Sequence, residues 1–118
     1  MKFLRTRNSP RPNPLAPAML VVVAMGQEMR LSVEPGRSLV VGRGAESDIV
    51  LADAAASDRH ALIKRAGPGW LVSSLDGSNL ACFLDSTGRA RPIESELGLR
   101  SGELLIGECQ VRLYSPPS

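Results

Sequence analysis

Short apolar stretches separated by turn-forming residues run through most of the chain. Residues 19–24 form a continuous apolar run, whereas residues 29–33 alternate apolar and polar side chains. A continuous run suits a buried strand, and alternation places one face of a strand in the core and the other in water. Further strands are expected at residues 38–41, 61–64, 70–73, 82–84, 104–107 and 111–114. With no helical periodicity over ten residues, the pattern predicts an all-β sandwich of two packed sheets.

The first 18 residues differ from the rest in composition. They contain four prolines, at positions 10, 12, 14 and 17. Each proline removes a backbone donor and fixes φ, so this segment is predicted to be a flexible, basic, Pro-rich arm. The predicted organisation is therefore an arm at 1–18, one domain at 19–115 and a short tail at 116–118.

A signal peptide is the alternative for the N-terminal segment, with Lys2 and Arg5 ahead of the apolar residues 20–25. However, Pro17 shortens the apolar run, and cleavage near Gly26 would remove the first expected strand. No apolar stretch approaches the length of a transmembrane helix.

Charge is distributed unevenly along the chain. Four of the 14 Lys and Arg residues lie in the first 18 positions, and all 12 Asp and Glu residues follow them. The formal net charge of +2 therefore hides a globular part in which acidic side chains outnumber basic ones. Overall basicity gives no reason to expect nucleic-acid binding, and any anion site must be local.

The reactive side chains are few. Two cysteines, Cys82 and Cys109, do not make the disulfide framework of a small secreted protein, so ordinary thiols in a reducing cytoplasm are expected. His60 is the only histidine. Without a second histidine or a Cys-x-x-Cys pair, neither a metal site nor another cofactor is expected.

One stretch carries most of the functional information. Residues 42–63 read GRGAESDIVLADAAASDRHALI, which resembles the signature of forkhead-associated (FHA) domains: Gly-Arg, four residues, Asp-Ile, then a Ser three residues before a His. The positions that match the family pattern are Gly42, Arg43, Asp48, Ile49, Leu51, Asp53, Ser57, His60, Ala61 and Ile63.

The resemblance extends over roughly residues 19–114 and implies both a fold and a function. FHA domains are β-sandwiches of mainly antiparallel sheets, and their ligand site sits on loops at one end. They bind phosphothreonine peptides. The resemblance therefore implies a module for phosphorylation-dependent protein–protein interaction and not an enzyme.

Arg43 and Ser57 are the first candidate phosphate ligands. The Arg43 guanidinium offers a planar fork of donors suited to bidentate contact with phosphate. The resemblance implies that the Ser57 hydroxyl donates to a phosphate oxygen, and that Gly42 and His60 are structural residues of the binding loops. A catalytic Ser-His pair is not expected, because a triad also needs a third orienting group and an oxyanion hole.

The second recognition loop allows three registers. FHA domains show Asn-Gly-Thr or Asn-Gly-Ser at a place occupied here by residues 76–81. The preferred register puts Asn79 on the family asparagine, which fixes the peptide backbone, and makes Ser78 a phosphate donor. Leu80 then replaces a glycine, so the turn must differ from the usual one. The alternatives align Asp-Gly-Ser at 76–78 with Asn-Gly-Ser, or place Leu80 on the asparagine.

Asp58 and Arg59 complete the candidate binding residues. The family often has Arg, Lys or Asn where Asp58 stands. A carboxylate about 4 Å from a phosphate costs roughly 1 kcal/mol per unit charge in water and about 4 kcal/mol at an effective dielectric constant of 20. Arg59 can offset this cost, although on an extended segment its side chain points the opposite way.

Two functions follow from these residues. The leading prediction is a phosphothreonine-dependent docking module of a bacterial-style Ser/Thr kinase pathway or secretion apparatus, a context inferred from the family and from the Ala, Arg and Gly usage. Its partner would be a phosphothreonine-containing protein, a kinase substrate, and neither nucleic acid nor a membrane. The alternative is a degenerate FHA domain that binds a partner without phosphate as a scaffold or secretion-system component, favoured by Asp58, Leu80 and Ala81. No phosphate-binding glycine loop or paired-carboxylate motif indicates an enzyme.

Overall fold

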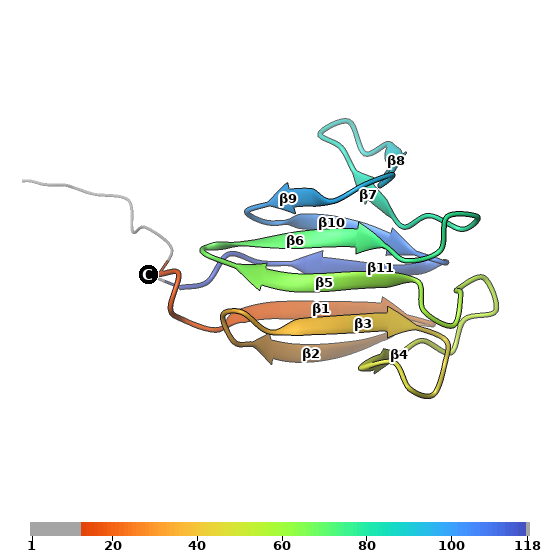
Figure 1. The fold of residues 1–118 in the computed structure, drawn as a ribbon, viewed down its shortest axis with the longest axis horizontal. Helices are drawn as coiled ribbons and strands as arrows, with labels where there is room; N and C mark the ends of the chain where they lie inside the picture. Colours follow the sequence, from red (N-terminus) through yellow and green to blue (C-terminus); the bar gives the residue numbers. More distant parts are fainter. Residues whose placement is uncertain (1–12, 118) are drawn as a thin grey trace, which may run out of the picture.

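The computed structural model describes residues 13–117, and within them it contains eleven β-strands and no helix (Figure 1). Two sheets pack face to face. The first has the strand order β2-β1-β11-β10-β7-β8 and the second the order β4-β3-β5-β6-β9. All strand pairs are antiparallel except β3 with β4. The strands are β1 (Ala18–Ala24), β2 (Gln27–Val33), β3 (Ser38–Gly42), β4 (Ile49–Val50), β5 (Ala61–Ala66), β6 (Gly69–Ser74), β7 (Cys82–Leu84), β8 (Ala90–Pro92), β9 (Leu97–Leu99), β10 (Gly102–Ile106) and β11 (Cys109–Leu113).

The core lies between the two sheets and is almost entirely aliphatic. Leu20 of β1 and Leu104 of β10 face Ile63 of β5 and Val72 of β6, and all four side chains are completely buried. The only tryptophan, Trp70, is also buried, and its indole N–H donates to the carbonyl oxygen of Tyr114 at 3.0 Å. Burial of these side chains supplies most of the driving force for folding.

One charged side chain, Arg65 of β5, lies within the core. Its Nη1 donates to the carbonyl oxygens of Ala16 (3.1 Å) and Val33 (2.7 Å), and its Nη2 donates to that of Gly67 (3.1 Å). Its guanidinium carbon lies 5.5 Å from the centre of the Trp70 ring. A buried cation is tolerated only with such partners, so Arg65 fastens the entry to β1 and the end of β2 to the second sheet.

The all-β sandwich predicted from the sequence is confirmed, but some details differ. The short strands β4, β8 and β9 were not expected. The side chain of Met29, placed on an inward face by alternation, is 46% exposed. It lies on the edge strand β2, and the nearby edge strand β4 of the other sheet has only two residues, so the facing sheet does not cover it. Residues 1–12 of the predicted flexible arm lie outside the described part of the chain.

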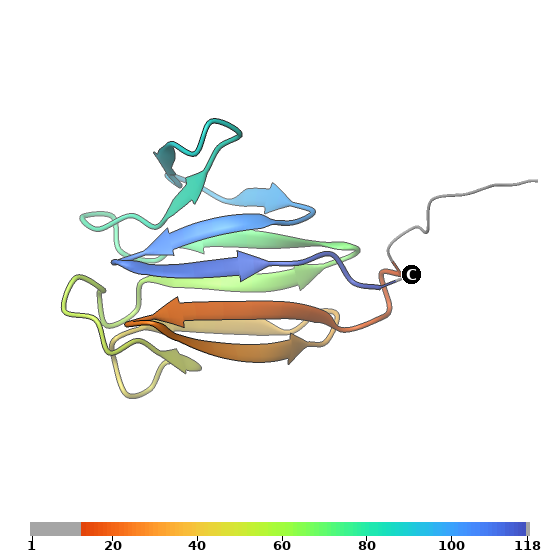
Figure 2. The same ribbon diagram turned by 180° about the vertical axis from the view of Figure 1, so that it is seen from behind.

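Three connections gather at one end of the sandwich: β3–β4 (residues 43–48), β4–β5 (51–60) and β6–β7 (75–81) (Figures 1 and 2). Both ends of the described chain lie at the opposite end, where the Asn13 N–H donates to the carbonyl oxygen of Pro117 at 3.0 Å. No helical segment within residues 13–117 has the length and apolarity needed to cross a membrane.

Candidate functional site

Arg43 directly follows β3, and the backbone around it is fixed by the β4–β5 connection. The Arg43 N–H donates to the carbonyl oxygen of Ser57 at 2.8 Å, and the Gly44 N–H donates to that of Asp58 at 3.0 Å. A β-carbon on Gly42 would overlap the Asp58 carbonyl oxygen, so this close approach requires glycine. The Arg43 side chain is 51% exposed and free to meet a ligand in solvent.

His60 is completely buried and links β3 to the β4–β5 and β6–β7 connections. Its N–H donates to the carbonyl oxygen of Val41 in β3, and its own carbonyl oxygen accepts from the N–H of Leu75, both at 2.9 Å. Its Nδ1 accepts the backbone N–H of Ser57 at 3.1 Å, which places the imidazole proton on Nε2. His60 therefore holds the backbone of Ser57 and makes no contact that would activate the Ser57 hydroxyl.

The side chains of Ser57 and Asn79 meet between the β4–β5 and β6–β7 connections. The Asn79 Nδ2 donates to the Ser57 Oγ at 2.9 Å and to the carbonyl oxygen of Ala55 at 3.0 Å. Within residues 13–117, the Asn79 Oδ1 accepts no hydrogen bond, so it remains available to an N–H of a ligand. The preferred register thus places an asparagine beside the serine of the signature.

A carboxylate, Asp76, occupies the same cluster. Its Oδ2 accepts the Ser57 hydroxyl at 2.6 Å, and its Oδ1 accepts the Ser78 hydroxyl at 2.8 Å and the Ser78 N–H at 3.0 Å. These hydrogen bonds, the one from Ser57 first, hold the pKa of Asp76 below its usual range, so the group is ionised at neutral pH. Both serine hydroxyls are therefore engaged by one carboxylate.

The same residue explains how the turn forms without the usual glycine after the asparagine. The Asn79 N–H donates to the carbonyl oxygen of Asp76 at 3.1 Å, and the bond from the Ser78 N–H to the Asp76 side chain closes the turn at its start. Side chains of aspartate commonly stabilise turns in this way. Leu80 therefore does not need a positive φ and does not have one.

Asp58 and Arg59 lie beside Arg43. The Arg43 Nε is 3.7 Å from the Asp58 Oδ1, and the Asp58 side chain is 79% exposed. The chain bends at residues 58 and 59, and both residues line one hollow of about 330 Å³ with residues 44–47. Opposite orientations were expected for an extended segment, but the segment is bent at these residues, so the premise of that expectation does not hold.

The β4–β5 connection is anchored from beneath by Asp53. Its Oδ2 accepts the N–H of Glu108 at 2.6 Å and the thiol of Cys109 at 3.3 Å, and its Oδ1 accepts the N–H of Ala55 at 2.9 Å. The bond from Glu108 contributes most to holding the pKa of Asp53 below its usual range. Burial, together with Asp53, raises the pKa of the Cys109 thiol to about 11, so this thiol stays protonated at neutral pH.

The structure therefore brings most of the candidates from the sequence to one end of the sandwich. Arg43, Ser57, Asp58, Ser78 and Asn79 lie on adjoining connections, and Gly42 and His60 support them from the end of β3 and the start of β5. Arg59 lies at the edge, facing the hollow. The preferred register left Asp76 out of the site, and only one alternative register put its carboxylate at the family asparagine position, although an Asp-Gly-Ser run at 76–78 signals a turn closed by the aspartate.

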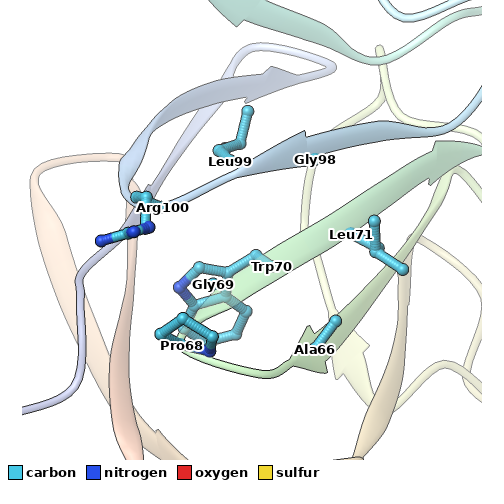
Figure 3. A pocket seen from close by; sticks show the side chains of 8 residues that line it. All are labelled: Ala66, Pro68, Gly69, Trp70, Leu71, Gly98, Leu99 and Arg100. Atoms are coloured by element: carbon cyan, nitrogen blue, oxygen red, sulfur yellow. The ribbon is translucent and has the colours of Figure 1, made fainter. Parts of the chain in front are cut away.

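Two further observations concern possible ligand sites elsewhere in the described structure. Within residues 13–117, no three His, Cys, Asp or Glu side chains gather closely enough to hold a metal ion. A pocket of about 340 Å³ near the β5–β6 turn is lined by Ala66, Pro68, Gly69, Trp70, Leu71, Gly98, Leu99 and Arg100 (Figure 3). It lies at the end opposite the signature residues, and its lining is largely apolar and backbone.

The fold has many solved counterparts. The FHA domain of CT664 protein from Chlamydia trachomatis is 24% identical with a TM-score of 0.73, covering 85% of this chain and 98% of that one. An FHA domain solved in a study of phosphothreonine-dependent FHA domain interactions is 22% identical with a TM-score of 0.70, covering 86% of this chain and 99% of that one.

A third counterpart is Mycobacterium tuberculosis EmbR in complex with a low-affinity phosphopeptide. It is 25% identical with a TM-score of 0.67, and the match covers 87% of this chain and 25% of that one. Comparison with curated protein sequences gave no match. The FHA domain family model matches residues 39–105, more than half of the chain, and these residues include the whole signature and both recognition loops. On this match and on the sandwich that carries it, the protein belongs to the FHA domain family.

Proposed function

We propose that this FHA domain binds phosphothreonine-containing segments of partner proteins and thereby mediates phosphorylation-dependent protein–protein interaction. The observation that carries the proposal is the convergence of Arg43, Ser57, Ser78 and Asn79 at the end of the sandwich. Arg43 supplies a charged fork, the serines supply hydroxyls, and Asn79 supplies an amide whose Nδ2 is 2.9 Å from the Ser57 Oγ. This donor set suits a phosphate with an adjoining peptide backbone.

Each residue has a distinct role in the proposed complex. Arg43 makes charge-assisted hydrogen bonds to the phosphate, and the hydroxyls of Ser57 and Ser78 turn from Asp76 to phosphate oxygens. Asn79 accepts a backbone N–H of the ligand through Oδ1 while its Nδ2 keeps the loops together. Asp58 and Arg59 border the phosphate, and Gly42 and His60 keep the loops in place.

Relatives support the ligand class. One similar FHA domain comes from a study of phosphothreonine-dependent interactions, and EmbR was solved with a phosphopeptide. For this chain, the proposed partner is a protein phosphorylated by a Ser/Thr kinase, met in the cytoplasm of a bacterial cell. The proposed function involves no nucleic acid, no membrane and no catalysed reaction.

A second function rests on a specific observation. Carboxylates already engage the donors: Asp58 pairs with Arg43, and Asp76 holds the hydroxyls of Ser57 and Ser78. A partner that binds without phosphate would leave these contacts intact and dock against them. This arrangement corresponds to the degenerate FHA domain considered from the sequence.

The deciding experiment is binding to a degenerate phosphothreonine peptide library and to its unphosphorylated copy, measured at about pH 7 or above, where phosphate is largely a dianion. Binding of the phosphorylated library alone supports the first function. Equal binding of both libraries supports the second, and a phosphoserine version tests whether the threonine methyl group contributes.

A further inference from the structure

The ion pair between Arg43 and Asp58 indicates which charged side chain a ligand should carry. This inference rests on the proposed function, in which Arg43 binds the phosphate. A phosphate that takes the Arg43 guanidinium removes the one cation that pairs with Asp58 among residues 13–117. The backbone of Asp58 is held in place. Its carbonyl oxygen accepts the Gly44 N–H at 3.0 Å and the Ser47 hydroxyl at 2.9 Å, which fixes its backbone beside the Arg43 turn.

Binding therefore leaves the Asp58 carboxylate close to a phosphate dianion. Like charges at short range repel each other, and the repulsion is relieved when a cation lies between or beside them. Arg59 is on the same loop, yet it makes no ion pair with Asp58 within the described residues. The side chain that pairs with Asp58 is that of Arg43. A basic side chain of the ligand can supply the missing cation.

The surface next to Asp58 has room for such a cation. The hollow of about 330 Å³ is lined by the small residues Gly44 and Ala45, by the acidic residues Glu46 and Asp58, and by Ser47 and Arg59. A long aliphatic stem with a charged head can lie along small residues while its head reaches a carboxylate. Arginine and lysine have this shape.

We propose that the phosphorylated segment recognised by this domain carries an arginine or lysine close to the phosphothreonine. When the segment binds, Arg43 exchanges Asp58 for the phosphate, and the basic side chain of the ligand takes the place of Arg43 on Asp58. The charges of both carboxylate and phosphate are then paired, and the domain selects segments with a basic flank over segments with an acidic one.

The test uses one phosphothreonine peptide in which a single flanking position at a time is Arg, Gln or Glu, with Kd measured by fluorescence anisotropy. At one or more positions Arg is expected to bind about two- to fivefold more tightly than Gln, the range for an exposed ion pair, and Glu more weakly than Gln. The preference should decrease as salt rises.

Three variants locate the effect. Asp58→Asn should abolish the preference for Arg, and Glu46→Gln should reduce it. Glu34→Gln is the matched control, because it removes a negative charge from the exposed β2–β3 turn at the other end of the sandwich and should leave the preference unchanged. Arg59→Gln should keep or strengthen the preference.

The outcomes separate the two proposals. Phosphopeptides that bind equally with Arg, Gln and Glu flanks, or best with Glu, would overturn the inference and leave the proposed function standing. A preference for Arg that persists in Asp58→Asn would also overturn it. Failure of every phosphopeptide to bind would remove the proposed function and the inference with it.

Discussion

The side chains of Ser57 and Asn79 are joined by a hydrogen bond of 2.9 Å although 22 residues separate them in the sequence. This bond brings a hydroxyl from the β4–β5 connection and an amide from the β6–β7 connection to one point. Because His60 also fixes the backbone of Ser57, the pair is held in position before any ligand arrives. A prepositioned pair of side chains loses little conformational entropy on binding.

Arg43→Ala is expected to abolish measurable phosphopeptide binding while the fold stays intact. The side chain is half exposed and makes no contact with the core, whereas charge-assisted bonds to phosphate are strong. Arg43→Lys should also weaken binding, because a point charge cannot reproduce the fork. Titration calorimetry gives the affinities, and circular dichroism checks the fold.

Arg37→Ala is the matched control, since Arg37 is an exposed arginine in the β2–β3 turn at the opposite end of the sandwich. Its affinity should equal that of the wild type. If Arg43→Ala bound phosphopeptide as well as the wild type, the phosphate site would have to lie elsewhere.

Asp58→Asn is expected to tighten binding of a phosphothreonine peptide with neutral flanks by about 1 kcal/mol, and Asp58→Lys by more, because the carboxylate near the phosphate is removed or reversed. Both gains should shrink as salt rises. Calorimetry with phosphorylated and plain versions of one peptide makes the measurement. Should the plain peptide bind and the substitutions weaken it, Asp58 would be a contact for a basic group in phosphate-independent binding.

Asp76→Asn is also expected to strengthen phosphopeptide binding. The asparagine retains an oxygen that can close the turn, but it no longer holds the Ser57 and Ser78 hydroxyls through a charge-assisted bond. The hydroxyls are then released more readily to phosphate. Asp76→Ala should weaken binding relative to Asp76→Asn, because the turn that carries Asn79 loses its side-chain support.

Asp85→Asn provides a control with the same local structure. Asp85 accepts the N–H and hydroxyl of Thr87 much as Asp76 accepts those of Ser78, but in the β7–β8 turn. This variant should leave the affinity for phosphopeptide unchanged. A decrease in affinity in Asp76→Asn would mean that Asp76 positions the serines and does not compete with phosphate.

The lowered pKa of the Asp53 carboxyl predicts how the free energy of unfolding depends on pH. The pKa of its carboxyl in the folded protein lies below the ordinary value of 3.8, so the folded state favours the ionised form. The stabilising contribution is fully present above the unfolded pKa, near pH 4, and is lost as pH falls through the folded pKa. Urea unfolding at several pH values should show that the free energy of unfolding decreases less on acidification in Asp53→Asn than in the wild type.

The elements that the sequence predicted well are those whose signal is local. Strand β1 is a continuous apolar run, and β5 and β6 each begin with a largely apolar segment and are divided by Gly67 and Pro68, so hydrophobic patterning was enough. Strands β4, β8 and β9 have two or three residues each, and neighbouring strands create them. A tertiary contact of this kind leaves no periodic signal.

The residues of the candidate site also divide into those that a local sequence pattern predicted and those that depend on tertiary contacts. Arg43 and Ser57 were found because fixed spacing in the signature marks them, and Asn79 because its loop follows a recognisable strand. The preferred register left out Asp76, because its contact with Ser57 crosses between two connections, 19 residues apart, and has no local signal. The hollow that Asp58 and Arg59 both line depends on a bend that propensities do not specify.

The hydrogen bond between the Asn13 N–H and the Pro117 carbonyl oxygen holds the two ends of the described chain side by side. The domain therefore has a single point of attachment. Polypeptide joined at either end of the described chain departs from the same place, on the far side from Arg43 and Asn79 (Figure 2). An anchored copy therefore presents the same face whichever end is held. The domain could also be inserted between two neighbouring residues of a host protein without separating them widely and without turning its loops toward the host.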